Sequence, residues 1–232
     1  MERRKIFIGI VFIYSVVTGF SQNARAQVSF SGDLTAVSTY VWRGLKANNG
    51  PALQSTAAFN YGIVSVGFWG SSIDFGDDLE VETDVFAEAI LPTGDLSSAI
   101  GITAYMLDFN SFNQYADAEM EMYASLGYGS FSLGVYYVPK QNSTKGDPSR
   151  SNYWLELSGE TAILGANLSA LLSYGTYSSR WMPDKATKDP VSFLTLTAGK
   201  SLSEQVNVFW SYTINLDSGF DNILYFGASH VL

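Results

Sequence analysis

The sequence predicts an all-β protein, namely a transmembrane antiparallel up-and-down β-barrel of twelve strands. After residue 26 the chain is a series of short segments in which apolar and polar residues alternate, as in strands with one apolar face. Long polar connections and short turns alternate between these segments, which is typical of bacterial outer-membrane barrels. Aromatic residues gather at the segment ends, where such barrels meet the membrane interfaces.

The first segment shows the alternation most clearly. In residues 28–36 the even-numbered positions hold Val, Phe, Gly, Leu and Ala, whereas the odd-numbered positions hold Ser, Ser, Asp and Thr. A period of two residues indicates a strand and leaves little room for a helix. Reading the same pattern along the chain, we expect strands at 28–42, 52–60, 63–71, 79–91, 96–107, 117–127, 131–139, 152–160, 164–175, 191–200, 205–215 and 222–232.

The connections between the strands favour a membrane barrel over a soluble sandwich. Short turns are expected at 60–62, 92–95, 128–130, 160–163 and 201–204. Longer polar connections are expected at 44–51, 72–78, 108–116, 140–151, 176–190 and 217–221. Because outer-membrane barrels have short periplasmic turns and long extracellular loops, this order predicts that both chain ends lie in the periplasm.

The N-terminal residues 1–26 have the features of a cleaved secretory signal peptide. Three basic residues at positions 3–5 precede an apolar run from Ile6 to Phe20, and Ala24-Arg25-Ala26 precedes Gln27. This is the arrangement of a signal peptide with an A-x-A cleavage site, and the run is short for a membrane-spanning helix. We therefore divide the chain into the signal peptide 1–26 and an outer-membrane β-barrel over 27–232.

Composition excludes several classes of function. Removal of residues 1–26 takes Lys and Arg from 13 to 9 and Asp and Glu from 22 to 21, so the mature chain has a net charge of −12. A chain this acidic is not expected to bind nucleic acid. The absence of cysteine excludes disulfides, a thiolate metal site and a cysteine nucleophile. We predict no cofactor and no metal site.

The carboxylates show which face of the sheet turns toward the lumen. Glu80, Glu82, Asp84 and Glu88 share one face of the fourth predicted strand, opposite an apolar face. Carboxylates facing hydrocarbon would be very unfavourable, so this face is expected to line the lumen. By the same reasoning, three further lumen-lining carboxylates are predicted: Glu119, Glu121 and Glu156.

Arg43 is the basic residue expected inside the barrel. If the first strand stays regular to residue 42, Arg43 has the parity of Asp33 and points inward near Glu80 and Glu82. We predict that it pairs with a carboxylate of the wall. The pair would either create a transverse field at a pore constriction or form a structural salt bridge that narrows the lumen, and the structural role is favoured.

Aromatic residues at the strand ends are expected to form interfacial girdles. Tyr and Trp accumulate at both membrane–water interfaces of outer-membrane proteins, although Tyr is also a common residue of soluble strands. We assign six residues to the girdle on the side of the long connections: Tyr40, Trp42, Trp69, Tyr137, Tyr153 and Tyr212.

Several short motifs resemble a known family. Residues 38–44 read Ser-Thr-Tyr-Val-Trp-Arg-Gly, and residues 51–54 read Pro-Ala-Leu-Gln. Residues 67–71 read Gly-Phe-Trp-Gly-Ser, and the acidic stretch 80–84 follows. In order and spacing these motifs resemble the TorF family of porins, the Gcw_chp-type conserved outer-membrane protein family, over most of the mature chain. The resemblance implies a porin of the outer membrane and gives no substrate.

The sequence therefore favours a passive diffusion channel for small hydrophilic solutes with a preference for cations, exported to the bacterial outer membrane. A closed outer-membrane barrel with a structural or interaction role and a soluble periplasmic ligand-binding barrel remain alternatives. An enzyme is not expected, because His230 is the only histidine and no nucleophile elbow is present. Expected partners are outer-membrane lipid and lipopolysaccharide, which would meet the lysines and arginines of the two longest loops; association into homo-oligomers is left open.

Overall fold

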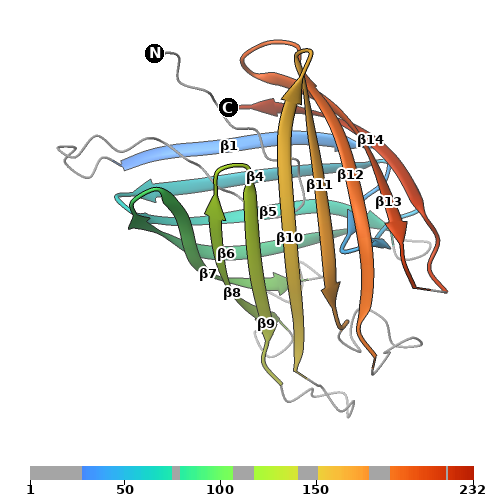
Figure 1. Cartoon of the computed structure of the whole chain (residues 1–232), viewed down its shortest axis with the longest axis horizontal. Coiled ribbons are helices and arrows are strands. Elements are labelled where there is room, and N and C mark those ends of the chain that lie inside the picture. Colours follow the sequence, from blue (N-terminus) through green and yellow to red (C-terminus); the bar gives the residue numbers. More distant parts are fainter. Residues whose placement is uncertain (1–27, 75–78, 107–117, 141–150, 178–188, 218) are drawn as a thin grey trace.

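A computed structural model describes residues 28–74, 79–106, 118–140, 151–177, 189–217 and 219–232. Twelve antiparallel strands form a closed barrel, and two further short strands form a hairpin (Figure 1). No helix in the described ranges is long and apolar enough to cross a membrane. The barrel strands are β1 Val28–Val37, β4 Ala52–Tyr61, β5 Val64–Asp74, β6 Leu79–Thr93, β7 Leu96–Met106, β8 Glu119–Tyr128, β9 Phe131–Val138, β10 Asn152–Ile163, β11 Ala166–Gly175, β12 Val191–Ser201, β13 Val206–Asn215 and β14 Ile223–Val231.

The strands follow one another around the barrel, and β1 pairs with β14 to close it. The closing pair runs in register from Asp33 opposite Val231 to Val37 opposite Gly227. The fold class and the strand number predicted from the sequence are therefore confirmed. The expected signal peptide lies outside the described residues, so its cleavage stays a prediction.

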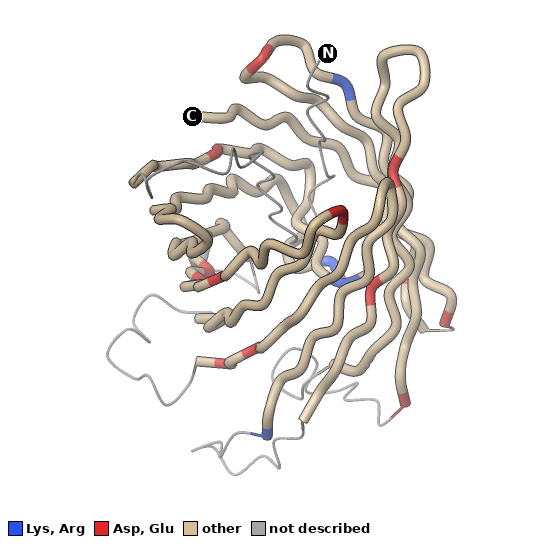
Figure 2. The backbone as a smooth tube through the Cα atoms, turned by 60° about the vertical axis from the view of Figure 1, so that its left-hand side comes forward, with Lys and Arg blue, Asp and Glu red and all other residues tan. Residues whose placement is uncertain are grey.

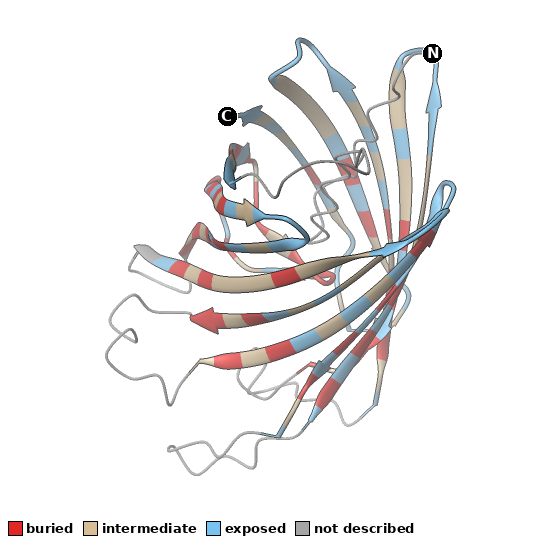
Figure 3. Ribbon diagram, turned by 90° about the vertical axis from the view of Figure 1, so that its left-hand side faces the viewer, coloured by how far each residue is buried: buried red, intermediate tan, exposed pale blue. Residues whose placement is uncertain are grey.

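Apolar side chains cover the outside of the barrel and polar side chains line much of the inside. In β10 and β11, the paired residues Leu157 and Leu172 are 51% and 43% exposed. Glu156 and Ser173, which are also paired, are 3% and 0% exposed. Figure 3 shows buried and exposed residues alternating along the strands. This orientation suits a barrel surrounded by lipid and is the reverse of a soluble ligand-binding barrel.

The first strand is shorter than the sequence predicted. It ends at Val37 instead of residue 42, and residues 41–46 form a separate hairpin of β2 Val41–Trp42 and β3 Leu45–Lys46. The alternation of inward and outward side chains, from which we predicted the orientation of Arg43, therefore ends before that residue. The prediction of a regular strand over 28–42 was wrong because a strand-like sequence turns back on itself after Trp42.

A second correction concerns the turn expected at 160–163. Strand β10 continues to Ile163, and the turn is made by Leu164 and Gly165. Both residues have positive φ, 53° and 78° respectively, as a two-residue hairpin turn of type I′ requires. Gly165 adopts this conformation at no steric cost. Leu164 is therefore an exposed turn residue and not the first residue of a lipid-facing strand.

An arginine on the outer face tests the orientation of the barrel. We expect Leu157→Arg to lower the free energy of unfolding by about 2–4 kcal/mol, because it places a cation on the lipid-facing surface. The matched change Leu202→Arg, in the exposed turn between β12 and β13, should cost about 0–1 kcal/mol. Denaturant titrations in lipid vesicles measure both values, and equal costs would contradict the assigned orientation.

Candidate functional site: the lumen and its internal hairpin

The connection from β1 to β4 folds across the inside of the barrel. Its hairpin has two turn residues, Arg43 and Gly44, with φ values of 44° and 77°. Two successive positive φ angles are those of a type I′ turn, which matches the twist of the flanking strands. The turn reaches side chains of β8 and β10, which lie far from β1 and β4 in the strand order. The hairpin therefore spans the lumen.

Gly44 is required at this turn for two reasons. Its φ of 77° lies in the region that glycine adopts most readily. A Cβ atom at this position would also lie 2.8 Å from both the Phe193 ring and the Asn215 side chain. The Asn215 side chain donates a hydrogen bond to the Gly44 carbonyl at 3.2 Å. The tip of the hairpin is thus packed closely against β12 and β13.

Asn48 holds the base of the hairpin. Its side-chain oxygen accepts hydrogen bonds from the Tyr40 backbone N–H at 2.6 Å and from the Thr39 hydroxyl at 3.0 Å. The Ala47 N–H donates to the Tyr40 carbonyl at 2.9 Å. These bonds satisfy backbone groups that would otherwise be buried without partners. The loop therefore has a defined internal structure and does not depend on contact with the wall alone.

Arg43 joins the hairpin to the opposite wall through two carboxylates. Its Nη1 and Nη2 atoms donate to the two carboxyl oxygens of Glu121 at 2.6 and 2.9 Å. Its Nε atom lies 3.5 Å from a carboxyl oxygen of Glu156. Tyr105 donates a further hydrogen bond to Glu121 at 2.8 Å. A bidentate arginine–carboxylate pair of this kind fixes both position and orientation.

Aromatic rings surround the same guanidinium group. The central carbon Cζ of Arg43 lies 4.9 Å from the Trp42 ring centroid, 4.8 Å from that of Tyr136 and 5.2 Å from that of Trp154. Each distance is within the range of a cation–π interaction. The hydroxyl of Tyr177 donates to the Arg43 carbonyl. The guanidinium and the backbone of Arg43 are therefore both held in place.

The charge of Arg43 is maintained despite its burial. Burial lowers the pKa of the guanidinium, whereas Glu121, Tyr105 and Glu156 raise it, and the net direction is upward. Arginine is protonated at all physiological pH values in any case. The hairpin therefore carries a permanent positive charge into the lumen.

Two carboxylates on β6 lie in a different environment. Glu82 and Asp84 are 1% and 0% exposed. Among the described residues, no hydrogen bond of ordinary geometry reaches their carboxyl oxygens, and the described ion pairs of Arg43 go elsewhere. Buried charges without a partner carry a desolvation cost. These two carboxyl groups take no part in the ion pairs that hold the hairpin.

The described lumen-lining residues carry far more acid than base. Arg43 is the only buried basic residue among them, against six buried acidic residues. Figure 2 shows acidic residues distributed over several strands of the barrel. The side chain of Glu80 lies outside the described part of the chain. The six buried acidic residues are Glu82, Asp84, Glu88, Glu119, Glu121 and Glu156.

Arg43 does face the lumen, but through a different route and with different partners from those expected. The sequence placed it on the first strand near Glu80 and Glu82. In the structure it lies at the hairpin tip and pairs with Glu121 and Glu156. The difference arises because the chain leaves the wall after Val37 and crosses the lumen before Arg43 is reached.

The girdle prediction is wrong for three of the six residues. Tyr40, Trp42 and Trp69 are 3%, 6% and 6% exposed and belong to an internal aromatic cluster. The first two lie on the internal loop, and Trp69 shares the inward face of β5 with Ser71. Each therefore faces away from lipid.

The other three girdle residues point outward. Tyr137, Tyr153 and Tyr212 are 45%, 39% and 40% exposed, as an interfacial residue needs to be, and their membrane role stays a prediction. The expected contact of basic loop residues with lipopolysaccharide is also untested. Lys140 is exposed beyond β9, and the remaining residues of that group, Lys145, Arg150, Arg180, Lys185 and Lys188, lie outside the described residues.

The sequence interpretation missed the aromatic residues that enclose Arg43. Trp154 lies between Asn152 and Glu156 on the polar face of β10, and Tyr136 has the lumen-facing parity of β9. The available signal was a large aromatic residue among the polar residues of the lumen face. Such a residue indicates that another group inside the barrel packs against its ring. The dipeptide Arg-Gly between Val-Trp and Leu-Lys was the corresponding signal for the hairpin.

The closed barrel with its apolar exterior and acidic lumen has the fold of an outer-membrane β-barrel protein. A family model described as "Bacterial protein of unknown function (Gcw_chp)" matches residues 21–219, and the chain belongs to that family. The resemblance inferred from the sequence motifs is therefore confirmed. The comparison with curated proteins finds no match.

Solved structures share the architecture at low sequence identity. The chain is similar to the COG4313 outer membrane channel from Pseudomonas putida F1, with 12% identity, a TM-score of 0.54, and coverage of 94% of this chain and 100% of that one. It is also similar to a protein from a study of in-meso crystallization of membrane proteins, with 11% identity, a TM-score of 0.52, and coverage of 87% and 83%. These likenesses support the fold.

Neutralising two different buried carboxylates should have unequal effects on stability. Glu82→Gln should change the free energy of unfolding by less than about 1 kcal/mol, because Glu82 takes no part in an ion pair and the amide keeps the shape of the side chain. Glu121→Gln should lower it by about 3 kcal/mol, because Arg43 loses a buried counter-charge. Denaturant titrations in vesicles measure both. A loss of stability of similar size in Glu82→Gln would mean that this carboxylate has a stabilising partner.

Removal of the Arg43 side chain should release the hairpin without opening the barrel. We expect Arg43→Ala to increase amide hydrogen exchange over residues 38–51 by about tenfold or more, because ion pairs and ring contacts of the hairpin are lost together. Exchange in β11 and β12 should stay unchanged. Mass spectrometry of peptic fragments measures both regions. Unchanged exchange over 38–51 would show that the loop is held by other contacts.

Proposed function

We propose that this protein is an outer-membrane channel for the passive diffusion of small hydrophilic solutes, with a preference for cations. The charge imbalance of the lumen carries the proposal. Six buried acidic residues and one buried basic residue occur among the described residues. A lumen lined by carboxylates attracts cations and repels anions. Both the fold and the membership of a bacterial family are consistent with this role.

The internal hairpin sets the size of solute in this proposal. Arg43 crosses to Glu121 and Glu156 on the far wall, so the free cross-section at this level is smaller than that of the empty barrel. Aromatic residues of the internal cluster fill further space beside the hairpin. A passage of this kind suits small solutes and excludes large ones. Arg43 also adds a local positive charge opposite the acidic wall, and so creates a transverse field.

The same hairpin supports a second candidate function. If the ion pairs and aromatic contacts hold the loop permanently across the lumen, the barrel is closed and serves as a structural or interaction protein. The close packing of Gly44 against Phe193 favours this alternative. The two functions differ in one measurable property, which is ion conduction.

Conductance across a planar bilayer distinguishes the two functions. We expect the mature chain, residues 27–232, to give discrete current steps, and the reversal potential in a salt gradient to have the sign of a cation-selective channel. Arg43→Ala should increase both the step size and the cation preference, because it removes a positive charge and releases the hairpin. Lys200→Ala, which removes a positive charge at an exposed position, is the matched control and should change neither.

The opposing outcomes are well separated. Anion selectivity of the unaltered chain would contradict the role assigned to the acidic lumen. A folded and inserted barrel that gives no current would favour the closed structural barrel. Unchanged selectivity in Arg43→Ala would show that the guanidinium does not act on permeating ions.

A further inference from the structure

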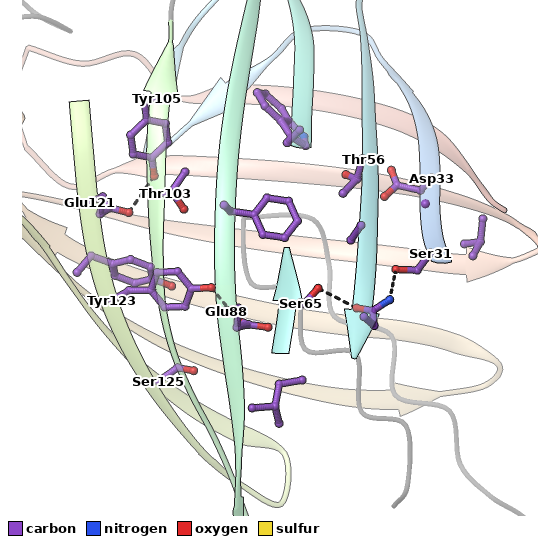
Figure 4. A pocket seen from close by; sticks show the side chains of 18 residues that line it. Ser31, Asp33, Thr56, Ser65, Glu88, Thr103, Tyr105, Glu121, Tyr123 and Ser125 are labelled. Carbon is purple, nitrogen blue, oxygen red and sulfur yellow. Dashed lines mark hydrogen bonds between the residues drawn. The ribbon is translucent and has the colours of Figure 1, made fainter. Parts of the chain in front are cut away.

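A cavity lies inside the barrel beside the hairpin. Its volume is about 200 Å³, and its lining comes from β1, β4 to β9 and β14 (Figure 4). This is enough room for one small organic molecule, and it lies along the lumen through which solutes would pass in the proposed function. The cavity wall includes the apolar side chains of Phe86, Ile90 and Trp69.

The charged side chains among the described residues of the cavity wall are all acidic. Asp33, Glu88 and Glu121 contribute carboxylates, and no lysine or arginine is among the described lining residues. Tyr105, Tyr123 and Tyr136, together with Phe86 and Trp69, provide aromatic surface. Carboxylates combined with aromatic rings form the environment in which organic cations bind. An inorganic cation would gain little from the aromatic part of this wall.

The orientation of Glu88 depends on a glycine in the neighbouring strand. Gly101 of β7 lies between Glu88 of β6 and Tyr123 of β8 in the sheet register. A Cβ atom on Gly101 would lie 2.4 Å from the Tyr123 ring, so only glycine lets that ring lie against the wall. The Tyr123 hydroxyl then donates to a Glu88 carboxyl oxygen at 2.7 Å (Figure 4). The carboxylate is thereby oriented at the cavity.

Arg43 provides a precedent for cation binding at this wall. Tyr105, Glu121 and Tyr136 line the cavity and also contact Arg43 or its carboxylate partner. These side chains therefore already bind an organic cation, the guanidinium of this same chain. Glu121 is occupied by Arg43, and Asp33 accepts a hydrogen bond from the Thr35 hydroxyl on its own strand. Glu88 lies two positions from Phe86 on β6 and beside the Tyr123 ring, so it is the carboxylate that a second cation with an apolar part would use.

From these observations we infer that the cavity binds a small organic cation, with its charged group at Glu88 and its apolar part against Phe86 and the tyrosine rings. The inference rests on the proposed function in one respect, since it names the class of solute that such a channel would select. Binding itself does not require that the barrel conducts.

Calorimetric titration of the refolded mature chain, residues 27–232, in detergent at low salt tests this inference. The probes are benzylammonium, benzyl alcohol and benzoate, which share one ring and differ in charge. We expect benzylammonium to bind, and the other two to bind at least about tenfold more weakly, as expected for the loss of a charge-assisted hydrogen bond. Titration of empty micelles corrects for partition into detergent.

Two variants locate the site. Glu88→Gln should weaken benzylammonium binding by about tenfold, because the charge is lost while the shape is kept. Glu204→Gln makes the same chemical change in the exposed turn between β12 and β13 and should leave binding unchanged. The comparison of the three ligands uses the unaltered chain, so it remains decisive even if Glu88→Gln fails to fold.

Each outcome decides the inference separately from the proposed function. Equal binding of the three ligands, no binding of benzylammonium, or unchanged binding in a folded Glu88→Gln variant would overturn the cation site. A conducting barrel without benzylammonium binding contradicts only this inference. A barrel that binds benzylammonium but carries no current contradicts only the channel.

Discussion

Closure of the hydrogen-bonded sheet is the constraint on which the rest of this structure depends. In hydrocarbon each backbone N–H and C=O group has to be bonded within the protein, which a barrel without a free edge achieves. The β1–β14 seam supplies the last set of bonds. It is extended at both ends, where the Leu232 N–H donates to the Gly32 carbonyl at 3.0 Å and the Ser38 N–H donates to the Phe226 carbonyl at 2.8 Å. Once the barrel is closed, the alternation of side chains divides the protein into an apolar exterior and a polar interior.

The polar interior creates a second requirement, which the loop after β1 meets. Carboxylates that face one another across a confined lumen repel and lose hydration. Arg43 compensates two of them, Glu121 and Glu156, and the surrounding rings add cation–π contacts. Glu82 and Glu88 of the same acidic wall take no part in these ion pairs.

The sequence predicted the barrel well because period-two alternation is a local property that strand pairing preserves. It placed Glu82, Asp84 and the other described carboxylates on the buried face by the same rule. Parity failed at Tyr40 and Trp42, because it holds only while the backbone stays extended and the chain leaves the wall after Val37. The partners of Arg43 could not be predicted either, since contacts across a lumen join residues 78 positions apart in sequence and leave no periodic trace.

The ion pairs of Arg43 with Glu121 and Glu156 require that the hairpin occupies one fixed place inside the lumen. Because the chain has no cysteine, spin labels can be attached at Lys46→Cys on the hairpin and at Leu202→Cys in an exposed turn, and their separation measured by pulsed electron paramagnetic resonance in lipid. We expect one narrow distance distribution that becomes broad when Arg43 is replaced by alanine. A broad or multiple distribution in the chain with Arg43 intact would contradict a hairpin held in one place by Arg43.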